Sequence, residues 1–304
     1  MRAIFGEALS SLGEANYNLM VLTADVAKPT GVYKFAEAHP SRFFNVGISE
    51  QDMIGIASGL SLSGSVPVVA VFAPFLMRAW EQVRSTVARA NLNVKMVGTH
   101  AGLSASDEGG SHQSLEDVAL MRVLPNMTVV VPGDRQEIAE ATRAIVAMKG
   151  PVYMRLGRDE SLSFLEGEQV FRIGRAVTVA DGSDITVFSN GSMTAEVLAA
   201  AESLDIGVKV VHVPTVKPLD SGAIVSAARE TGLVACVEEH SVIGGLGSAV
   251  AELLSGEYPV PVKRIGVNDA YGESGPQREL LRKHGLVAES IGESLKRIVR
   301  GSAA

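Results

Sequence analysis

The chain has 304 residues, of which 46% are hydrophobic and 20% charged, so it can bury the cores of two domains of ordinary size. Its formal charge of −7 and its lack of a basic stripe argue against nucleic acid as a partner. The single cysteine excludes an internal disulfide framework, and no apolar run approaches the ~18 residues of a membrane span. With no signal-peptide core at the N-terminus, these features predict a cytoplasmic protein without a membrane partner.

Apolar strands alternate with amphipathic helices through the first half of the chain. Strands are predicted at residues 18–24, 66–72, 94–99, 127–132 and 151–156. Helices are predicted at residues 2–15, 31–39, 49–63, 74–90, 114–123 and 134–148. Because the strands are apolar throughout, both of their faces need cover, which indicates a parallel sheet between two helix layers.

The second half of the chain repeats this alternation after a polar stretch, 159–172, which we interpret as a linker. Its strands are predicted at residues 184–190, 208–214, 233–239 and 262–267. Its helices are predicted at residues 192–203, 219–230, 244–255, 275–284 and 291–300. The sequence therefore predicts an α/β fold with two doubly wound, mostly parallel sheets, in domains spanning 1–162 and 172–304.

Polar and aromatic side chains follow the first-half strands at their carboxyl ends, where doubly wound sheets bind ligands. In chain order these residues are Asp25, Phe75, His100, His112 and Arg158. Glu50 lies where a helix begins, directly after a short apolar strand, in the segment GISEQDM. Taken alone, such a carboxylate is most simply stabilised by the helix macrodipole, and a loop histidine is most simply a solvated surface residue. Their order along the chain is more informative than any one of them.

That order resembles the C-terminal half of transketolases, in which a pyrimidine-binding domain precedes a transketolase C-terminal domain. The matching segments are GISEQDM, FAPFLMRAWEQVR, the Thr99-His100 pair, GGSHQSLEDVALMRVLPNMTVVVPGDRQE and PVYMRLGR. As a set they are specific and extend over nearly all of the chain, whereas any one of them would be weak. The same order occurs in deoxyxylulose-phosphate synthases and, more loosely, in the beta subunits of 2-oxo-acid dehydrogenases.

The resemblance implies thiamine diphosphate as the cofactor. Glu50 would bond to the aminopyrimidine ring and favour the tautomer that can take the thiazolium proton. Phe75 would stack on that ring. Asp25 falls in a segment near the thiazolium, and Arg78 stands where many transketolases have a second aromatic residue, which leaves the cleft more polar there.

The resemblance also implies roles for the two histidines. His100 and His112 would line the cleft and exchange protons with donor hydroxyls and the carbonyl oxygen, which suits imidazole near neutral pH. The Thr99-His100 pair is transketolase-like, whereas deoxyxylulose-phosphate synthases usually carry an Asp-Arg pair there. Since the spacing of the histidines matches no zinc pattern, no metal site is predicted in this chain.

Phosphorylated sugars are the implied substrates. Arg158 resembles the arginine that binds the acceptor phosphate, with Arg155 as a lesser candidate. Arg2 and Thr30 fall in segments near the same phosphate. The family usually reads an acceptor hydroxyl with an aspartate before the second histidine, and the last substrate candidates are the neighbouring acids Asp107 and Glu108. Either of them could take that role, which leaves the stereoselectivity for the acceptor open.

The family binds Mg²⁺ and the diphosphate at a Gly-Asp-Gly segment with a downstream asparagine, and Gly-Asp-Gly does not occur in this sequence. The resemblance therefore implies one subunit of a split transketolase, which moves two-carbon ketol units between phosphorylated sugars as in the pentose phosphate pathway. An N-terminal transketolase subunit would share the cofactor and hold the Mg²⁺, in an assembly of two copies of each chain.

Two alternatives stay open. One keeps the cofactor but changes the donor, as in a deoxyxylulose-phosphate synthase or a 2-oxo-acid dehydrogenase beta subunit. The other is a non-catalytic scaffold subunit. The second half offers little chemistry: Cys236 is predicted to be a buried, inert thiol, and Glu238, Glu239 and His240 are predicted to be structural or interfacial.

Overall fold

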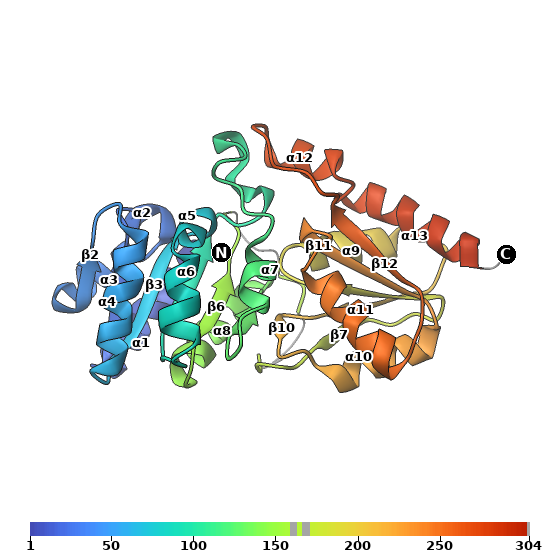
Figure 1. Ribbon diagram of the computed structural model, residues 1–304. Coiled ribbons are helices and arrows are strands. Elements are labelled where there is room, and N and C mark those ends of the chain that lie inside the picture. Colours follow the sequence, from blue (N-terminus) through green and yellow to red (C-terminus); the bar gives the residue numbers. More distant parts are fainter. Residues whose placement is uncertain (159–162, 166–170, 303–304) are drawn as a thin grey trace.

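The computed structural model describes residues 1–158, 163–165 and 171–302, which form two α/β units side by side (Figure 1). The first unit contains a seven-stranded sheet and the second a five-stranded sheet. The linker predicted at 159–172, and with it the predicted domain boundary at 162, falls largely outside the described residues.

The first sheet has the strand order β10-β5-β6-β4-β3-β1-β2. Its strands are β1 (Leu19–Thr23), β2 (Phe43–Asn45), β3 (Val66–Phe72), β4 (Lys95–Thr99), β5 (Thr128–Val130), β6 (Val152–Arg155) and β10 (Thr215–Lys217). All neighbouring strands are parallel except β10, which runs antiparallel to β5. The predicted doubly wound, mostly parallel sheet is confirmed.

Helices cover both faces of this sheet, as continuously apolar strands require. Successive residues of one strand enter different cores: Leu22 packs with residues of α4 on one face, and Val21 packs with residues of α1 and α8 on the other. The helical segments are α1 (Arg2–Ala15), α2 (Ala27–Thr30), α3 (Tyr33–Ala38), η1 (Pro40–Arg42), α4 (Glu50–Leu62), α5 (Ala73–Arg78), α6 (Trp80–Gln82), the π-helical turn η2 (Val83–Ala88), the 3₁₀ segment η3 (Leu103–Glu108), α7 (Asp117–Arg122) and α8 (Arg135–Ala147).

The second sheet has the strand order β12-β11-β8-β9-β7 and is again covered on both faces. Its strands are β7 (Val177–Ala180), β8 (Ile185–Ser189), β9 (Val208–His212), β11 (Val234–Ser241) and β12 (Val262–Val267). Its helices are α9 (Met193–Glu202), α10 (Ser221–Thr231), α11 (Leu246–Glu257), α12 (Gln277–Lys283) and α13 (Ala288–Ser302). Across the described ranges of the chain, no helix combines the length and the apolar character that a membrane crossing demands.

Two short strands were not predicted, and both are antiparallel edge strands. The more consequential is β10, which follows β9 in the chain but pairs with β5 of the first sheet, where Val131 N donates to Pro214 O at 2.7 Å. A three-residue strand carries too little periodicity to be recognised in sequence. The second half of the chain thereby completes the sheet of the first unit.

The helix predicted at 74–90 is interrupted. It divides at Ala79, whose N–H donates to Leu76 O at 2.9 Å in a tighter, 3₁₀-type closure. After α6 the backbone widens into η2, and Trp80 Nε1 donates to Leu120 O at 3.0 Å across to α7. The sequence of residues 74–90 has the length and the periodicity of one continuous helix. Periodicity does not reveal contacts with other helices, so the break and the contact with α7 could not be predicted from it.

Candidate active site

A cavity of about 530 Å³ lies at the carboxyl ends of β1 and β3, beside the start of α4. It is lined by Ala24, Asp25, Val26, Ile48, Glu50, Pro74, Phe75 and Arg78. The sequence predicted Asp25, Glu50, Phe75 and Arg78 as the cofactor-binding residues, and the fold brings all of them to this one space. Their contacts with a cofactor remain predictions.

Glu50 is the first residue of α4 and is only 5% exposed. The turn before the helix passes through Gly47 at φ 75°, a left-handed conformation that glycine adopts without strain. Within the described part of the chain, the Glu50 carboxylate has no hydrogen-bond or ion-pair partner, although it borders the cavity. Its oxygens are not among the fully buried, unpaired side-chain atoms of the described residues, so they open onto the cavity and are suited to accept a bond from a ligand.

Asn45, at the end of β2, shapes the rim of the cavity. Its Oδ1 accepts from the backbone N of Asp25 at 2.9 Å and of Gly47 at 3.1 Å, and its Nδ2 donates to Asp25 Oδ1 at 3.2 Å. These bonds hold Asp25 at φ 61° and leave its side chain exposed. The sequence analysis did not single out Asn45, although an asparagine two residues before a turn glycine is a recognisable signal.

Phe72 connects the cavity to both histidines. Its ring stacks on His100 with centroids 3.7 Å apart and on Phe75 with centroids 5.1 Å apart. Phe75 in turn meets His112 edge to face at 5.2 Å. Two loops that are separate in sequence are thus aligned by one aromatic stack. The sequence analysis did not single out Phe72 as a site residue, because an aromatic residue at the end of an apolar strand is most simply explained by core packing.

His100 is 1% exposed and follows β4 at φ 55°. Its Nε2 lies 3.2 Å from Arg2 Nη1, and its Nδ1 lies 3.0 Å from Thr99 Oγ1. A guanidinium can only donate, so Nε2 accepts and the ring proton is on Nδ1. Burial, together with Arg2, Arg158 and His112, lowers the pKa of His100 to about 3. The ring is therefore neutral near pH 7 and acts as an acceptor at Nε2.

His112 lies in the loop after η3 and is half-buried. Its backbone N–H donates to Gly109 O at 2.9 Å, and its Nδ1 is 3.0 Å from Ser111 Oγ. The edge contact places the ring beside Phe75, which lines the cavity. Among the described residues its Nε2 has no hydrogen-bond partner.

Two arginines flank His100. Arg2 Nη1 donates to Pro29 O at 3.0 Å as well as to His100. The Arg158 backbone donates to Ser104 Oγ at 3.0 Å, and its Nη1 is 3.6 Å from Glu108 Oε1. The predicted phosphate ligands Arg2 and Arg158 both lie close enough to His100 to lower its pKa, and Glu108 already contacts Arg158.

Two further predicted substrate residues, Thr30 and Asp107, are less well placed to contact a substrate. Thr30 is fully buried, and its hydroxyl donates within its own turn to Val26 O at 2.7 Å. Asp107 is exposed next to Glu108. Substrate contacts by either residue remain predictions.

Arg155, the lesser phosphate candidate, has a different role. It is 7% exposed, its Nε donates to Asp117 Oδ2 at 2.8 Å, and its Nη2 donates to Glu239 O at 2.9 Å. Tyr153 OH donates to the same Asp117 oxygen at 2.6 Å. With its guanidinium committed to these interior acceptors, Arg155 joins the two units and is not free to bind phosphate.

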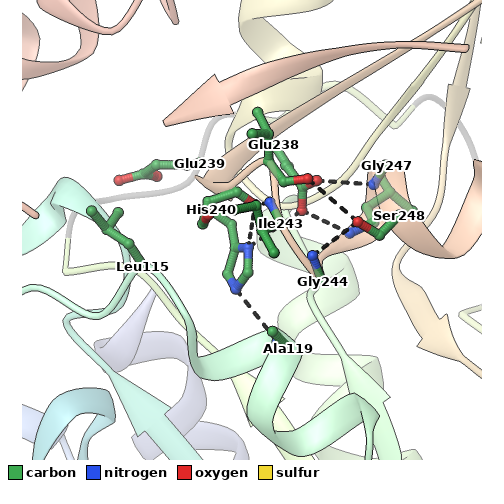
Figure 2. A network of polar contacts seen from close by, with 12 residues as sticks. Leu115, Ala119, Glu238, Glu239, His240, Ile243, Gly244, Gly247 and Ser248 are labelled. Carbon is green, nitrogen blue, oxygen red and sulfur yellow. Dashed lines mark hydrogen bonds and ion pairs between the residues drawn. The ribbon is translucent and has the colours of Figure 1, made fainter. Parts of the chain in front are cut away.

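The acidic cluster at the end of β11 was predicted to be structural or interfacial, and its members divide between the two: Glu238 bonds within the second unit, whereas Glu239 and His240 bond to the first. Figure 2 shows Glu238 beside the start of α11, where its carboxylate accepts from Leu246 N at 2.7 Å and Gly247 N at 2.9 Å. His240 Nε2 accepts from Ala119 N at 3.4 Å, and Glu239 Oε1 accepts from Leu103 N at 2.7 Å. The second unit thereby anchors both η3 and α7. Cys236, on the same strand, is buried, and burial raises the pKa of its thiol.

The described residues offer no cluster of side chains that would bind a metal ion. Among the residues described here, no group of three or more His, Cys, Asp or Glu side chains could hold a metal ion. The cavity itself offers the carboxylates of Glu50 and Asp25, the aromatic face of Phe75 and the guanidinium of Arg78, and the ring contacts of Phe72 and Phe75 connect it to His100 and His112.

Comparison with known proteins gives two family matches that together cover most of the chain. The transketolase pyrimidine-binding domain matches residues 1–161, and the transketolase C-terminal domain matches residues 174–291. The chain is 42% identical to a transketolase C-terminal section from Methanocaldococcus jannaschii, covering 97% of this chain and 95% of that protein.

Two other relatives are named for different reactions. A 6-deoxy-6-sulfo-D-fructose transketolase subunit from Clostridium is 41% identical over 96% of this chain and 92% of its own length. A 1-deoxy-D-xylulose-5-phosphate synthase from Syntrophotalea carbinolica is 36% identical over 99% of this chain but 49% of its own length. A solved structure described as a split gene transketolase, an inactive beta4 tetramer, superimposes with a TM-score of 0.89 at 44% identity, covering 98% of this chain and 97% of that one.

Proposed function

The chain belongs to the transketolase family, and we propose that it is the pyrimidine-binding subunit of a split transketolase that moves a two-carbon ketol unit between phosphorylated sugars. One observation carries this proposal: Glu50, a buried residue whose carboxylate has no partner among the described residues, lines the same cavity as Phe75. Phe75 contacts the ring of His112 directly and that of His100 through Phe72.

The residues round this cavity suit the pyrimidine end of thiamine diphosphate. Glu50 can accept a hydrogen bond from a ring nitrogen in a site where burial strengthens the interaction. Phe75 offers an aromatic face for stacking, worth ~0.5–1.5 kcal/mol beyond burial. Arg78 and Asp25 provide the polar rim. When bound, this cofactor supplies the carbon nucleophile that takes up and releases the ketol unit.

His100 and His112 have different roles toward the substrate. His100 is neutral and its Nε2 accepts from Arg2 Nη1, so it orients this arginine and does not exchange protons near pH 7. His112 is half-buried with Nδ1 toward Ser111, so its Nε2 can hold or pass a proton at a substrate hydroxyl.

Arg2 and Arg158 bind the terminal phosphate of the sugar. Both lie close enough to His100 to lower its pKa, so the three groups lie close together. Their charge suits a phosphomonoester through charge-assisted hydrogen bonds. Thr30 is buried in the turn beneath this end and supports it from within, and Asp107 or Glu108 reads the acceptor hydroxyl. A sugar sulfonate is a second candidate substrate, because a relative at 41% identity is named for a sulfosugar reaction.

The Mg²⁺ and diphosphate site belongs to a partner subunit in this proposal. The segment Gly-Asp-Gly is absent from the sequence, and the described residues offer no metal-binding group. An N-terminal transketolase subunit would supply both, in an assembly with two copies of each chain. The similarity to a structure described as an inactive beta4 tetramer supports self-association by this type of chain and a need for the partner.

Calorimetry tests the shared site. The isolated chain is expected to bind thiamine diphosphate weakly, whatever the Mg²⁺ concentration. Adding the product of a neighbouring gene that encodes Gly-Asp-Gly should tighten cofactor binding and produce activity together, because ligand binding at a shared site is linked to assembly. Tight, Mg²⁺-dependent binding and full turnover by the purified chain alone would refute the proposal.

The donor distinguishes this proposal from its alternatives. Turnover of xylulose 5-phosphate with a ribose acceptor supports a transketolase. Pyruvate decarboxylation would instead favour a deoxyxylulose-phosphate synthase-like or 2-oxo-acid dehydrogenase-like enzyme. A complex that binds no cofactor would favour a scaffold subunit.

A further inference from the structure

Glu108 occupies an unexpected place beside the proposed phosphate site. Its Oε1 is 3.6 Å from Arg158 Nη1, and the two side chains are 37% and 38% exposed. Arg2 and Arg158 bring two positive charges to the site, and Glu108 cancels one of them. His100 adds none near pH 7, because burial and the neighbouring arginines keep its pKa at about 3.

The position of this pair is determined by the fold. Ser104 Oγ accepts from the Arg158 backbone at 3.0 Å and donates to Ala101 O at 2.6 Å, so η3 and the end of β6 are tied together. Gln113 Nε2 donates to Ser106 O at 3.1 Å and to Glu273 O at 2.9 Å, which ties the same segment to the second unit.

The turn after Glu108 is equally constrained. Gly109 has φ 81°, and a side chain there would collide with Ser274. Both units therefore fix the backbone on either side of Glu108, which keeps its carboxylate within reach of Arg158. A surface ion pair of two freely moving side chains would have no such support.

We propose that Glu108 is a specificity-determining residue, which makes the site of Arg2 and Arg158 prefer a singly charged end group, such as a sulfonate or sulfate ester, over a doubly charged phosphate ester. This inference rests on the proposed function and concerns the end group of the same substrate. A carboxylate a few ångströms from the bound anion repels a dianion about twice as strongly as a monoanion of the same shape. Phosphate esters carry close to two negative charges above pH 7, whereas sulfate esters and sulfonates carry one.

Methyl phosphate and methyl sulfate are matched probes, because they share shape and differ in charge. Their dissociation constants can be measured at pH 8 on the full chain from the side-chain Nε–H signals of its arginines. Glu108→Gln should tighten methyl phosphate about tenfold and methyl sulfate about threefold, so the ratio of the two constants shifts about threefold toward phosphate. Solvent screening limits the effect to this order.

Two further variants make the result specific. Glu257→Gln removes a negative charge from the exposed last residue of α11, about 17 Å along that helix from its start beside Glu238, and should change neither constant by more than about twofold, since exposed charges beyond a Debye length are screened. Arg158→Ala should weaken both probes.

The outcomes separate this inference from the proposed function. An unchanged ratio in Glu108→Gln, or weaker binding of both probes, would mean that Glu108 positions Arg158 without selecting charge, and would overturn the inference alone. If neither probe binds the wild-type chain and Arg158→Ala changes nothing, the proposed phosphate site fails together with the inference.

Discussion

Two buried glutamates, each in the first turn of a helix, have opposite environments. Glu137, in α8, is 2% exposed; its Oε2 accepts from Gly133 N at 2.8 Å and lies 2.9 Å from Nε2 of His212 in the second unit. Glu50, in α4, is almost as buried but has no partner among the described residues and borders a cavity. A satisfied buried carboxylate stabilises the fold, whereas an unsatisfied one marks a place for a ligand.

The same contrast extends over two regions. The seam between the units contains groups that bond to one another, such as Arg155 with Asp117 and Glu239 with Leu103 N. Near the cavity, Asp25 and His100 adopt left-handed conformations, which local contacts hold: Asn45 bonds to Asp25, and Arg2 and Thr99 bond to His100.

Replacing Glu50 by Gln gives the sharpest test of this contrast. Turnover in the assembled enzyme should fall about 10²–10⁴-fold, because the bond to the cofactor ring loses its charge and its proton acceptor. The free energy of unfolding of the isolated chain, measured by urea denaturation, should change by less than about 1 kcal/mol. Wild-type exchange of the thiazolium proton in the mutant enzyme would contradict the role of Glu50.

Replacing Glu137 by Ala should produce the reverse pattern. Leaving Gly133 N and His212 without their acceptor should lower the free energy of unfolding by about 3 kcal/mol. Glu50→Ala is the matched control, with the same atoms removed from a buried carboxylate. Equal losses of stability in the two variants would show that the contrast between satisfied and unsatisfied glutamates is wrong.

Arg158→Ala tests the polar end of the cavity. The Michaelis constant for a phosphorylated acceptor should rise about 10- to 100-fold, since a hydrogen bond to a charged group is worth ~1.5–3 kcal/mol. An unphosphorylated acceptor should react as with the wild type. Steady-state kinetics with both acceptors measures this difference, and equal effects on the two would mean that Arg158 is structural.

His100 provides a test by pH. Its pKa is about 3 in the folded chain against an ordinary value near 6.5, so between these values the unfolded chain binds more protons. Stability should therefore fall as the pH drops below 6.5, by about 2 kcal/mol at pH 5 from this group. The loss should be absent in His100→Gln. NMR titration should find no protonation of His100 between pH 5 and 8, and a midpoint near 6.5 would exclude the buried, neutral ring.

Much of the fold could be predicted from sequence because it depends on local patterns, whereas the site residues were predicted from the resemblance of their segments to a known family, and their roles remain predictions. The long strands of both sheets are apolar throughout, which is enough to predict parallel sheets covered on both faces. Glu50, Phe75, His100 and His112 follow strands or open helices, and parallel strands bring their carboxyl ends to one edge of the sheet.

What the tertiary structure alone decided depends on contacts between segments far apart in the chain. β10 crosses to the first sheet, Arg155 is committed to Asp117 and Glu239, and Glu108 meets Arg158. Residue type and spacing place a charged side chain near a strand end, but they do not say which neighbour it will meet. That choice follows from packing between the units, and it separates Arg155, which holds the units together, from Arg158, which we propose binds a ligand.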